Sequence, residues 1–167
     1  MDIEEDIEFE RIIKEIDDSE VFQKTKDIIH HCSNRYDHCK RVAYYTYLIS
    51  KKLHLSYEEA TRAAMLHDFF LVDNKDITFK DKYVTLVNHP KYALAFSEKH
   101  FNLTNKEKDI IVTHMFPIAP TRVPKYLESW IVNLVDDYVA LKEEIYDKKR
   151  RLIGLTNFLL AFTMLNK

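Results

Sequence analysis

Apolar residues recur every three or four positions along most of this 167-residue chain, the spacing of helices that bury one face. The pattern predicts helices at residues 2–16, 19–31, 35–53, 56–67, 90–101, 104–114, 125–141 and 155–165, with a short apolar helix or turn at 81–88. Ser19 is expected to cap the second helix, and Ser56 and Thr104 each begin a capping-box sequence. Apolar residues surround the 125–141 segment, so we expect that helix to be central.

Glycine is almost absent from the chain, which holds Gly154 and no other. Tight hairpins and parallel-sheet turns need residues that adopt positive φ, and glycine is the usual one. The predicted fold class is therefore all-α, with Gly154 marking a break before the last helix. The same scarcity excludes a glycine-rich phosphate loop and a dinucleotide-binding fingerprint.

The length fits one domain over residues 1–167. The net charge of −2 gives no overall basic surface, so we expect no polymeric nucleic acid as a partner. We also expect no membrane partner, because no apolar run approaches the roughly 18 residues that cross a bilayer. Cys32 and Cys39 are interpreted as reduced thiols of a cytoplasmic protein. The sequence leaves open whether the chain forms a homodimer.

Two histidines lie on the apolar faces of neighbouring predicted helices. His38 shares its face with three residues that follow it at helical spacing, Val42, Tyr45 and Ile49. His67 shares its face with the small residues Ala60, Ala63 and Ala64. Two histidines on buried faces, one of them next to Asp68, could supply the first ligands of a metal site. The alternative is that each imidazole is a hydrogen-bonded core residue.

Three further candidates follow along the chain. His89 stands before Pro90 at an expected helix start, where it could equally be a capping residue. His114 ends its predicted helix with the ring directed inward. Asp136 and Asp137 lie in the middle of an apolar helix, where burial of an unpaired carboxylate is costly, and we choose Asp136 as the metal ligand. The other histidines are interpreted as helix-end cations or surface residues, namely His30, His31, His54 and His100.

The order of these residues resembles the HD-domain superfamily of metal-dependent phosphohydrolases. The resemblance rests on the Arg-x-x-His form at Arg35, the Leu-His-Asp form at His67-Asp68 and the Leu-Val-Asp form ending at Asp136. It covers about residues 30–145, the expected metal-binding core of an HD-type helical bundle. Two intervening histidines, His89 and His114, match the branches of the superfamily that hold two metals. Phe69 and Phe70 follow the pair where the family commonly has Ile-Gly.

The resemblance implies a metal-activated water that cleaves a phosphate ester of a nucleotide or another small phosphorylated metabolite. It implies that one ion is bound by four residues, His38, His67, Asp68 and Asp136. It also implies a second ion site, which His89 and His114 complete and in which Asp68 bridges the two ions. Mixed imidazole and carboxylate ligands suit iron, manganese, cobalt or zinc. Arg35, one turn before His38, is a candidate for substrate phosphate binding and catalysis together with Asp68, and Lys125 is a weaker phosphate contact. The alternatives are a di-iron oxygenase of HD type and a non-catalytic binding or regulatory module.

Overall fold

The computed structural model describes residues 3–30, 33–71, 79–119 and 122–165 of the chain. Its α-helices are α1 (Ile7–Asp17), α2 (Glu20–Gln23), α3 (Arg35–Lys52), α4 (Tyr57–Leu66), α5 (Phe79–His100), α6 (Asn105–Thr113) and α7 (Leu127–Leu165). Two short 3₁₀ turns, η1 (Ile3–Glu5) and η2 (Lys24–Asp27), and a two-stranded antiparallel ribbon of β1 (Ile29–His30) and β2 (Ser33–Asn34) complete it. The predicted all-α class is confirmed.

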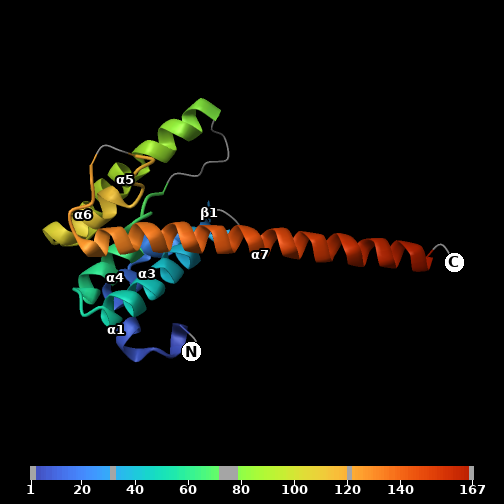
Figure 1. Cartoon of the computed structure of the whole chain (residues 1–167), viewed down its shortest axis with the longest axis horizontal. Helices are drawn as coiled ribbons and strands as arrows, with labels where there is room; N and C mark the ends of the chain where they lie inside the picture. The colour runs from blue at the N-terminus through green and yellow to red at the C-terminus, as the bar shows by residue number, and fades with distance from the viewer. Residues whose placement is uncertain (1–2, 31–32, 72–78, 120–121, 166–167) are drawn as a thin grey trace.

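The helices pack into one body with α3 and α4 at its centre (Figure 1). Helix α3 packs against α4 and α7, α4 packs against α6, and α1 lies beneath α4. Three alanines of α4, Ala60, Ala63 and Ala64, are completely buried, and their small side chains allow the close approach of neighbouring helices. At the other side of the core, Phe9 of α1 packs edge-on against Tyr44 of α3. The packing of α4 against α3 and α6 brings the ends of α4 and α6 near the start of α3.

The predicted helix over 19–31 is wrong beyond its first turn. Ser19 does cap it, since its hydroxyl accepts a hydrogen bond from the Phe22 amide, but α2 ends at Gln23. The Thr25 hydroxyl then donates to the Phe22 carbonyl, a local bond that competes with helix continuation. The chain turns through η2 into the β1–β2 ribbon, so His30 lies in a strand and not at a helix end. His31 lies outside the described residues.

The two predicted capping boxes have different outcomes. At Thr104 the box is confirmed, because the Thr104 amide donates to Glu107 Oε2 at 2.7 Å while the Glu107 amide donates to Thr104 Oγ1 at 3.2 Å. At Ser56 it is absent, since the Ser56 side chain makes no capping bond to its own helix. The Ser56 amide instead donates to Glu128 Oε1 of α7 at 3.0 Å. A tertiary partner there replaces the local one.

Two predicted helix boundaries are also wrong. Helix α5 begins at Phe79, well before Pro90, and continues through it, so the 81–88 segment is part of a longer helix. Helix α7 runs from Leu127 to Leu165 without a break at Gly154. A glycine inside a helix costs only about 1 kcal/mol, which a helix of 39 residues can absorb. The polar loop expected at 73–76 lies outside the described residues.

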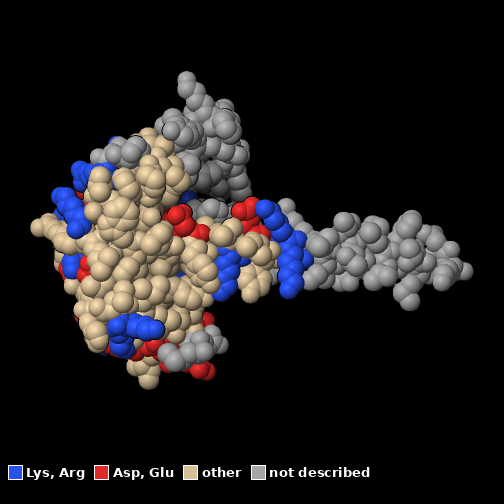
Figure 2. Space-filling model, in the orientation of Figure 1, with Lys and Arg blue, Asp and Glu red and all other residues tan. Residues whose placement is uncertain are grey.

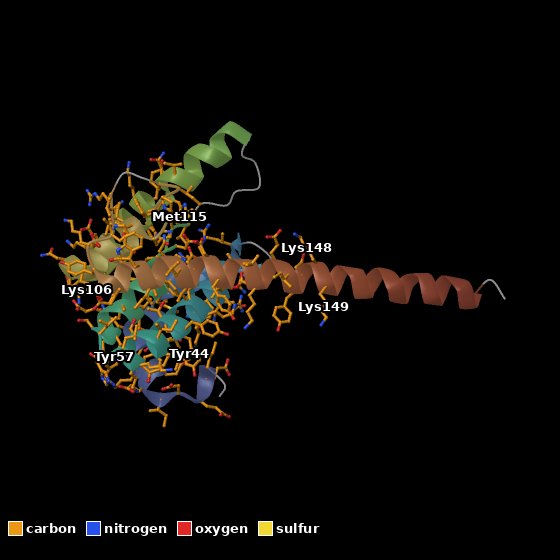
Figure 3. The ribbon with its side chains drawn as sticks, viewed as in Figure 1. Tyr44, Tyr57, Lys106, Met115, Lys148 and Lys149 are labelled. Carbon is orange, nitrogen blue, oxygen red and sulfur yellow. The ribbon has the colours of Figure 1, made fainter. Side chains whose placement is uncertain are left out.

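Helix α7 has one buried face and one exposed face, so the expectation that apolar packing surrounds it is wrong. Val132, Val135 and Val139 face the core. Leu134 and Leu141 keep 64% and 58% of their surface exposed. The ribbon continues beyond the other helices, and Lys148 and Lys149 lie on that projecting part (Figures 1 and 3). None of the helices in the described ranges combines the length and apolar character needed to span a membrane.

Charged side chains form small groups on the surface. Figure 2 shows a face covered mostly by uncharged residues, with acidic and basic side chains in small separate groups, and the described residues on this face form no extended basic surface. Several of the pairs bridge helices, such as Arg11 of α1 with Glu58 of α4 at 2.7 Å. The surface charge therefore ties helices together more than it forms a binding patch.

Candidate metal centre

The structure brings all six predicted ligand residues together in one buried cluster. Three of them lie within helices and three lie just after the ends of two others: His38 on α3, His89 on α5 and Asp136 on α7, with His67 and Asp68 just after α4 and His114 just after α6. Each is at least nine-tenths buried. The correct faces were predicted even though some helix boundaries were not, as at His89, which lies inside α5 and not at a helix start.

One half of the cluster joins α3, α4 and α7. His38 Nε2 lies 2.9 Å from Asp136 Oδ1, and His67 Nε2 lies 3.5 Å from the same oxygen. The His67 nitrogen is also 3.9 Å from Asp68 Oδ2. One carboxylate oxygen of Asp136 and two imidazole nitrogens therefore point to a common position.

The other half joins α4, α5 and α6. His89 Nε2 lies 2.9 Å from His114 Nε2 and 3.2 Å from Asp68 Oδ1, while the His114 nitrogen is 3.6 Å from that oxygen. The ring centroids of His67 and His114 are 5.0 Å apart, so the two halves adjoin. Asp68 presents Oδ2 to the first half and Oδ1 to the second. It is the residue between the two halves.

Helix ends determine which ring nitrogen of two histidines faces the cluster. The last carbonyls of a helix have no amide partner within it. His67 directly follows α4 and its Nδ1 lies 2.7 Å from the Ala64 carbonyl, while His114 directly follows α6 and its Nδ1 lies 2.7 Å from the Ile111 carbonyl. A carbonyl can only accept, so both Nδ1 atoms carry the proton. When these rings are neutral, Nε2 of each presents a lone pair to the cluster.

Burial and neighbouring charges shift the pKa of His38 and the pKa of His114 in opposite directions. Burial alone would lower the pKa of His38, but hydrogen bonds with Asp136 and Glu143 raise it to about 9. Burial would likewise raise the pKa of Asp136, yet the adjacent His67 and His38 hold it well below its usual range. In the other half, burial and the neighbouring His89 lower the pKa of His114 to about 3, so that ring is neutral at pH 7.

The donor set fits a metal ion. Four imidazoles and two carboxylates supply nitrogen and oxygen ligands of the kind that bind divalent transition metals. Within the cluster, three groups of three residues place their ligand atoms within 4.8 Å of one another. His67 Nε2 is buried with its nearest carboxylate oxygens at 3.5 and 3.9 Å, longer than a good hydrogen bond. An ion between these atoms would satisfy that nitrogen.

The predicted phosphate contacts lie in different surroundings. Arg35 has no exposed surface, donates a hydrogen bond to the Phe70 carbonyl, and lies over the Phe70 ring with Cζ 3.8 Å from its centroid. The Lys125 side chain is exposed, and its backbone amide donates to Asp109 Oδ2 at 3.0 Å. The phosphate roles of both residues stay predictions.

Asp137, the alternative to Asp136 as the last metal ligand, does not face the cluster. Asp137 is exposed, while its neighbour Asp136 faces the histidines. Burial of part of its side chain and the adjacent Asp136 raise the pKa of Asp137. The geometry therefore agrees with the choice of Asp136.

Sequence reasoning missed Glu143. Its Oε2 lies 3.2 Å from His38 Nδ1, and its Oε1 accepts hydrogen bonds from Arg41 at 2.8 Å. The available signal was its position seven residues after Asp136, which places both acids on one face of a helix. Periodicity alone could not tell which residue of α3 would lie opposite that face.

Comparison with known proteins identifies the class. The HD domain family matches residues 35–141, a span that begins at Arg35 and contains every residue of the cluster. The chain belongs to the HD domain family. Neither the curated proteins nor the solved structures gave a match to this chain.

Proposed function

We propose that this protein is a metal-dependent phosphohydrolase that cleaves a phosphate ester of a nucleotide or another small phosphorylated metabolite. The observation that carries the proposal is the buried cluster of four histidines and two aspartates inside an HD domain. Burying so many ionisable side chains together is costly unless the group is compensated, and divalent ions would compensate it.

The proposed centre holds two ions. His38, His67, Asp68 and Asp136 would hold the first, and Asp68, His89 and His114 would hold the second, with Asp68 bridging. The separation of the two Asp68 oxygens, one toward His67 and one toward His89, supports this division. Bound divalent ions would lower the pKa of a coordinated water toward about 7 and stabilise charge on the phosphoryl oxygens.

The protein side chains contribute orientation and exclusion of water. Because His67 and His114 are held through Nδ1 by backbone carbonyls, their Nε2 atoms need no rearrangement to bind. Arg35 and Lys125 are proposed to contact the substrate phosphate. For Arg35, the contact with Phe70 equally supports a role in holding the turn that follows Asp68.

The test combines metal content with a phosphate-release screen. Protein purified without chelator should contain close to two ions of iron, manganese, cobalt or zinc per chain by elemental analysis, and it should release phosphate or a nucleoside monophosphate from at least one ester. Asp68→Ala should lose ions and activity together, because Asp68 would serve both ions. Asp137→Ala is the matched control: an exposed acid beside Asp136 whose loss should change neither.

Oxygen separates this reaction from the oxygenase alternative, which has the same types of ligand. Phosphate release by the manganese-loaded protein under anaerobic conditions supports the hydrolase. If the protein carries both ions and releases phosphate from none of the nucleotides and sugar phosphates tested, the hydrolase proposal is wrong. Oxygen-dependent turnover would then indicate the oxygenase, and its absence a binding module.

A further inference from the structure

His38 differs from the other two oriented histidines in its place on a helix. It is the fourth residue of α3, whereas His67 and His114 follow the last residues of α4 and α6. Carbonyls in the first turn of a helix are already bonded to amides further along, and only the last ones are unpaired. A backbone carbonyl three residues earlier is therefore not the natural acceptor for His38 Nδ1. Another part of the chain must supply one.

Helix α7 places a carboxylate at each nitrogen of His38. Asp136 Oδ1 lies 2.9 Å from Nε2, and Glu143 Oε2 lies 3.2 Å from Nδ1. The two acids are seven residues apart, two helical turns, and so lie on one face of α7. A neutral imidazole has one N–H, so it can donate to only one of the two carboxylates. If Nε2 binds an ion, the proton must lie on Nδ1, where Glu143 accepts it.

The guanidinium of Arg41 holds the Glu143 carboxylate in place. Arg41, one turn after Asp37 on α3, contacts Glu143 Oε1 through Nε at 2.8 Å and through a terminal nitrogen at 2.7 Å. The same terminal nitrogen donates to Ser33 Oγ of β2 at 2.7 Å. The Glu143 side chain keeps 9% of its surface exposed, so water competes little for these bonds. The carboxylate is thus fixed by Arg41 on one oxygen and bonded to the histidine through the other.

We infer that Glu143, held by Arg41, is a positioning residue that selects the Nδ1-protonated form of His38 and directs Nε2 at the first ion. The inference rests on the metal binding of the proposed function. Hydrogen-bond partners of this kind commonly change metal affinity by about 10- to 100-fold when they are removed. Glu143 and Asp136 would then let one helix supply both a ligand and the group that orients another ligand.

Zinc titration of the metal-free 167-residue chain tests this, with affinity and stoichiometry measured by calorimetry. Glu143→Ala should weaken the first site about 10- to 100-fold and leave the His89–His114 site unchanged. Glu143→Gln, which keeps an acceptor oxygen, should recover part of that loss. The matched control is Glu144→Ala, the adjacent acid with an exposed side chain, which should bind zinc like the wild type.

A purely structural Glu143, joining α3 to α7 through Arg41, predicts a different pattern. Arg41→Ala would then lower thermal stability as much as Glu143→Ala does, with both zinc affinities unchanged in each variant. Under our inference, the zinc-loaded wild type shows a slowly exchanging His38 Nδ1 proton by NMR, and Glu143→Ala exchanges it rapidly. Should Glu143→Ala fold poorly, the same measurements on Glu143→Gln and Arg41→Ala decide the matter.

The outcomes separate this inference from the proposed reaction. Equal zinc affinities in the wild type and Glu143→Ala overturn the positioning role and leave the hydrolase proposal intact. Normal zinc binding without phosphate release overturns the reaction and leaves the positioning role intact. A wild-type protein that binds none of zinc, iron, manganese and cobalt overturns both.

Discussion

Replacing Arg35 tests whether its guanidinium binds substrate or holds the fold. Its observed contacts are internal: a hydrogen bond to the Phe70 carbonyl and stacking over the Phe70 ring. A hydrogen bond from a charged donor contributes about 1.5–3 kcal/mol, and a desolvated cation–π contact about 0.5–2 kcal/mol. Arg35→Ala should therefore lower the free energy of unfolding by about 2–5 kcal/mol, and the Phe70 carbonyl would lose a donor.

Urea denaturation measures this change. With a typical slope of about 2 kcal/mol per molar urea, the midpoint should fall by about 1–2.5 M. The control is Arg11→Ala, which removes an exposed arginine paired with Glu58 on the surface and should leave the midpoint near the wild-type value. If Arg35 only holds the fold, turnover per folded molecule, measured below the transition, should change little.

The opposite result would refute this reasoning. If Arg35→Ala unfolds at the wild-type urea concentration but loses transition-state stabilisation of about 2–4 kcal/mol, the guanidinium contacts the reacting phosphate. The ion content should be unchanged in either case, because Arg35 supplies no ligand atom in the proposed centre.

Three further predictions follow from the cluster and from the α6–α7 contact. His114→Ala should bind about one ion fewer per chain and keep the first site partly filled; retention of the wild-type ion count would make His114 structural. Removing the metal with a chelator should lower the melting temperature by about 5–10 °C, since an ion at 100 times its Kd adds about 2.7 kcal/mol, and an unchanged melting temperature would argue against metal binding to the folded chain. Burial alone would raise the pKa of Glu128, but hydrogen bonds with Lys106 and the Ser56 amide outweigh it and lower that pKa. The ionised Glu128 therefore contributes to folding stability above pH 4.5, and this contribution is lost on acidification. The stability difference between wild type and Glu128→Gln should therefore shrink as pH falls below about 4.5, and a constant difference in urea titrations from pH 7 to pH 3 would contradict this.

The helices were predictable where local signals and burial agree. Thr104 and Glu107 are three residues apart and satisfy each other, so the start of α6 can be read from sequence alone. At Ser56 the same kind of local signal fails, because Glu128, 72 residues away, bonds to its amide instead. Pro90 inside α5 shows the same limit, since a helix of 22 residues continues through the proline despite one missing hydrogen bond.

The cluster was predictable for a related reason. His38 and Asp136 each occupy a position on a helical face whose direction follows from residue spacing, and helical faces that bury apolar residues meet in the core. Glu143 was not predicted because its contact with His38 depends on the axial offset between the packed helices α7 and α3. Nothing in the spacing of either helix determines that offset. The metal-binding role of the cluster itself stays a prediction.

Cys39 sits next to His38 on α3 and has no exposed surface. A thiol reagent can reach it only when α3 separates from the helices packed against it, so in a Cys32→Ser background its labelling rate would time that opening. Since α3 also carries His38 and Arg41, the event that exposes the sulfur is the one that takes the first site apart. The labelling rate of Cys39 therefore reports how often the proposed metal centre opens, and no substrate is needed to measure it.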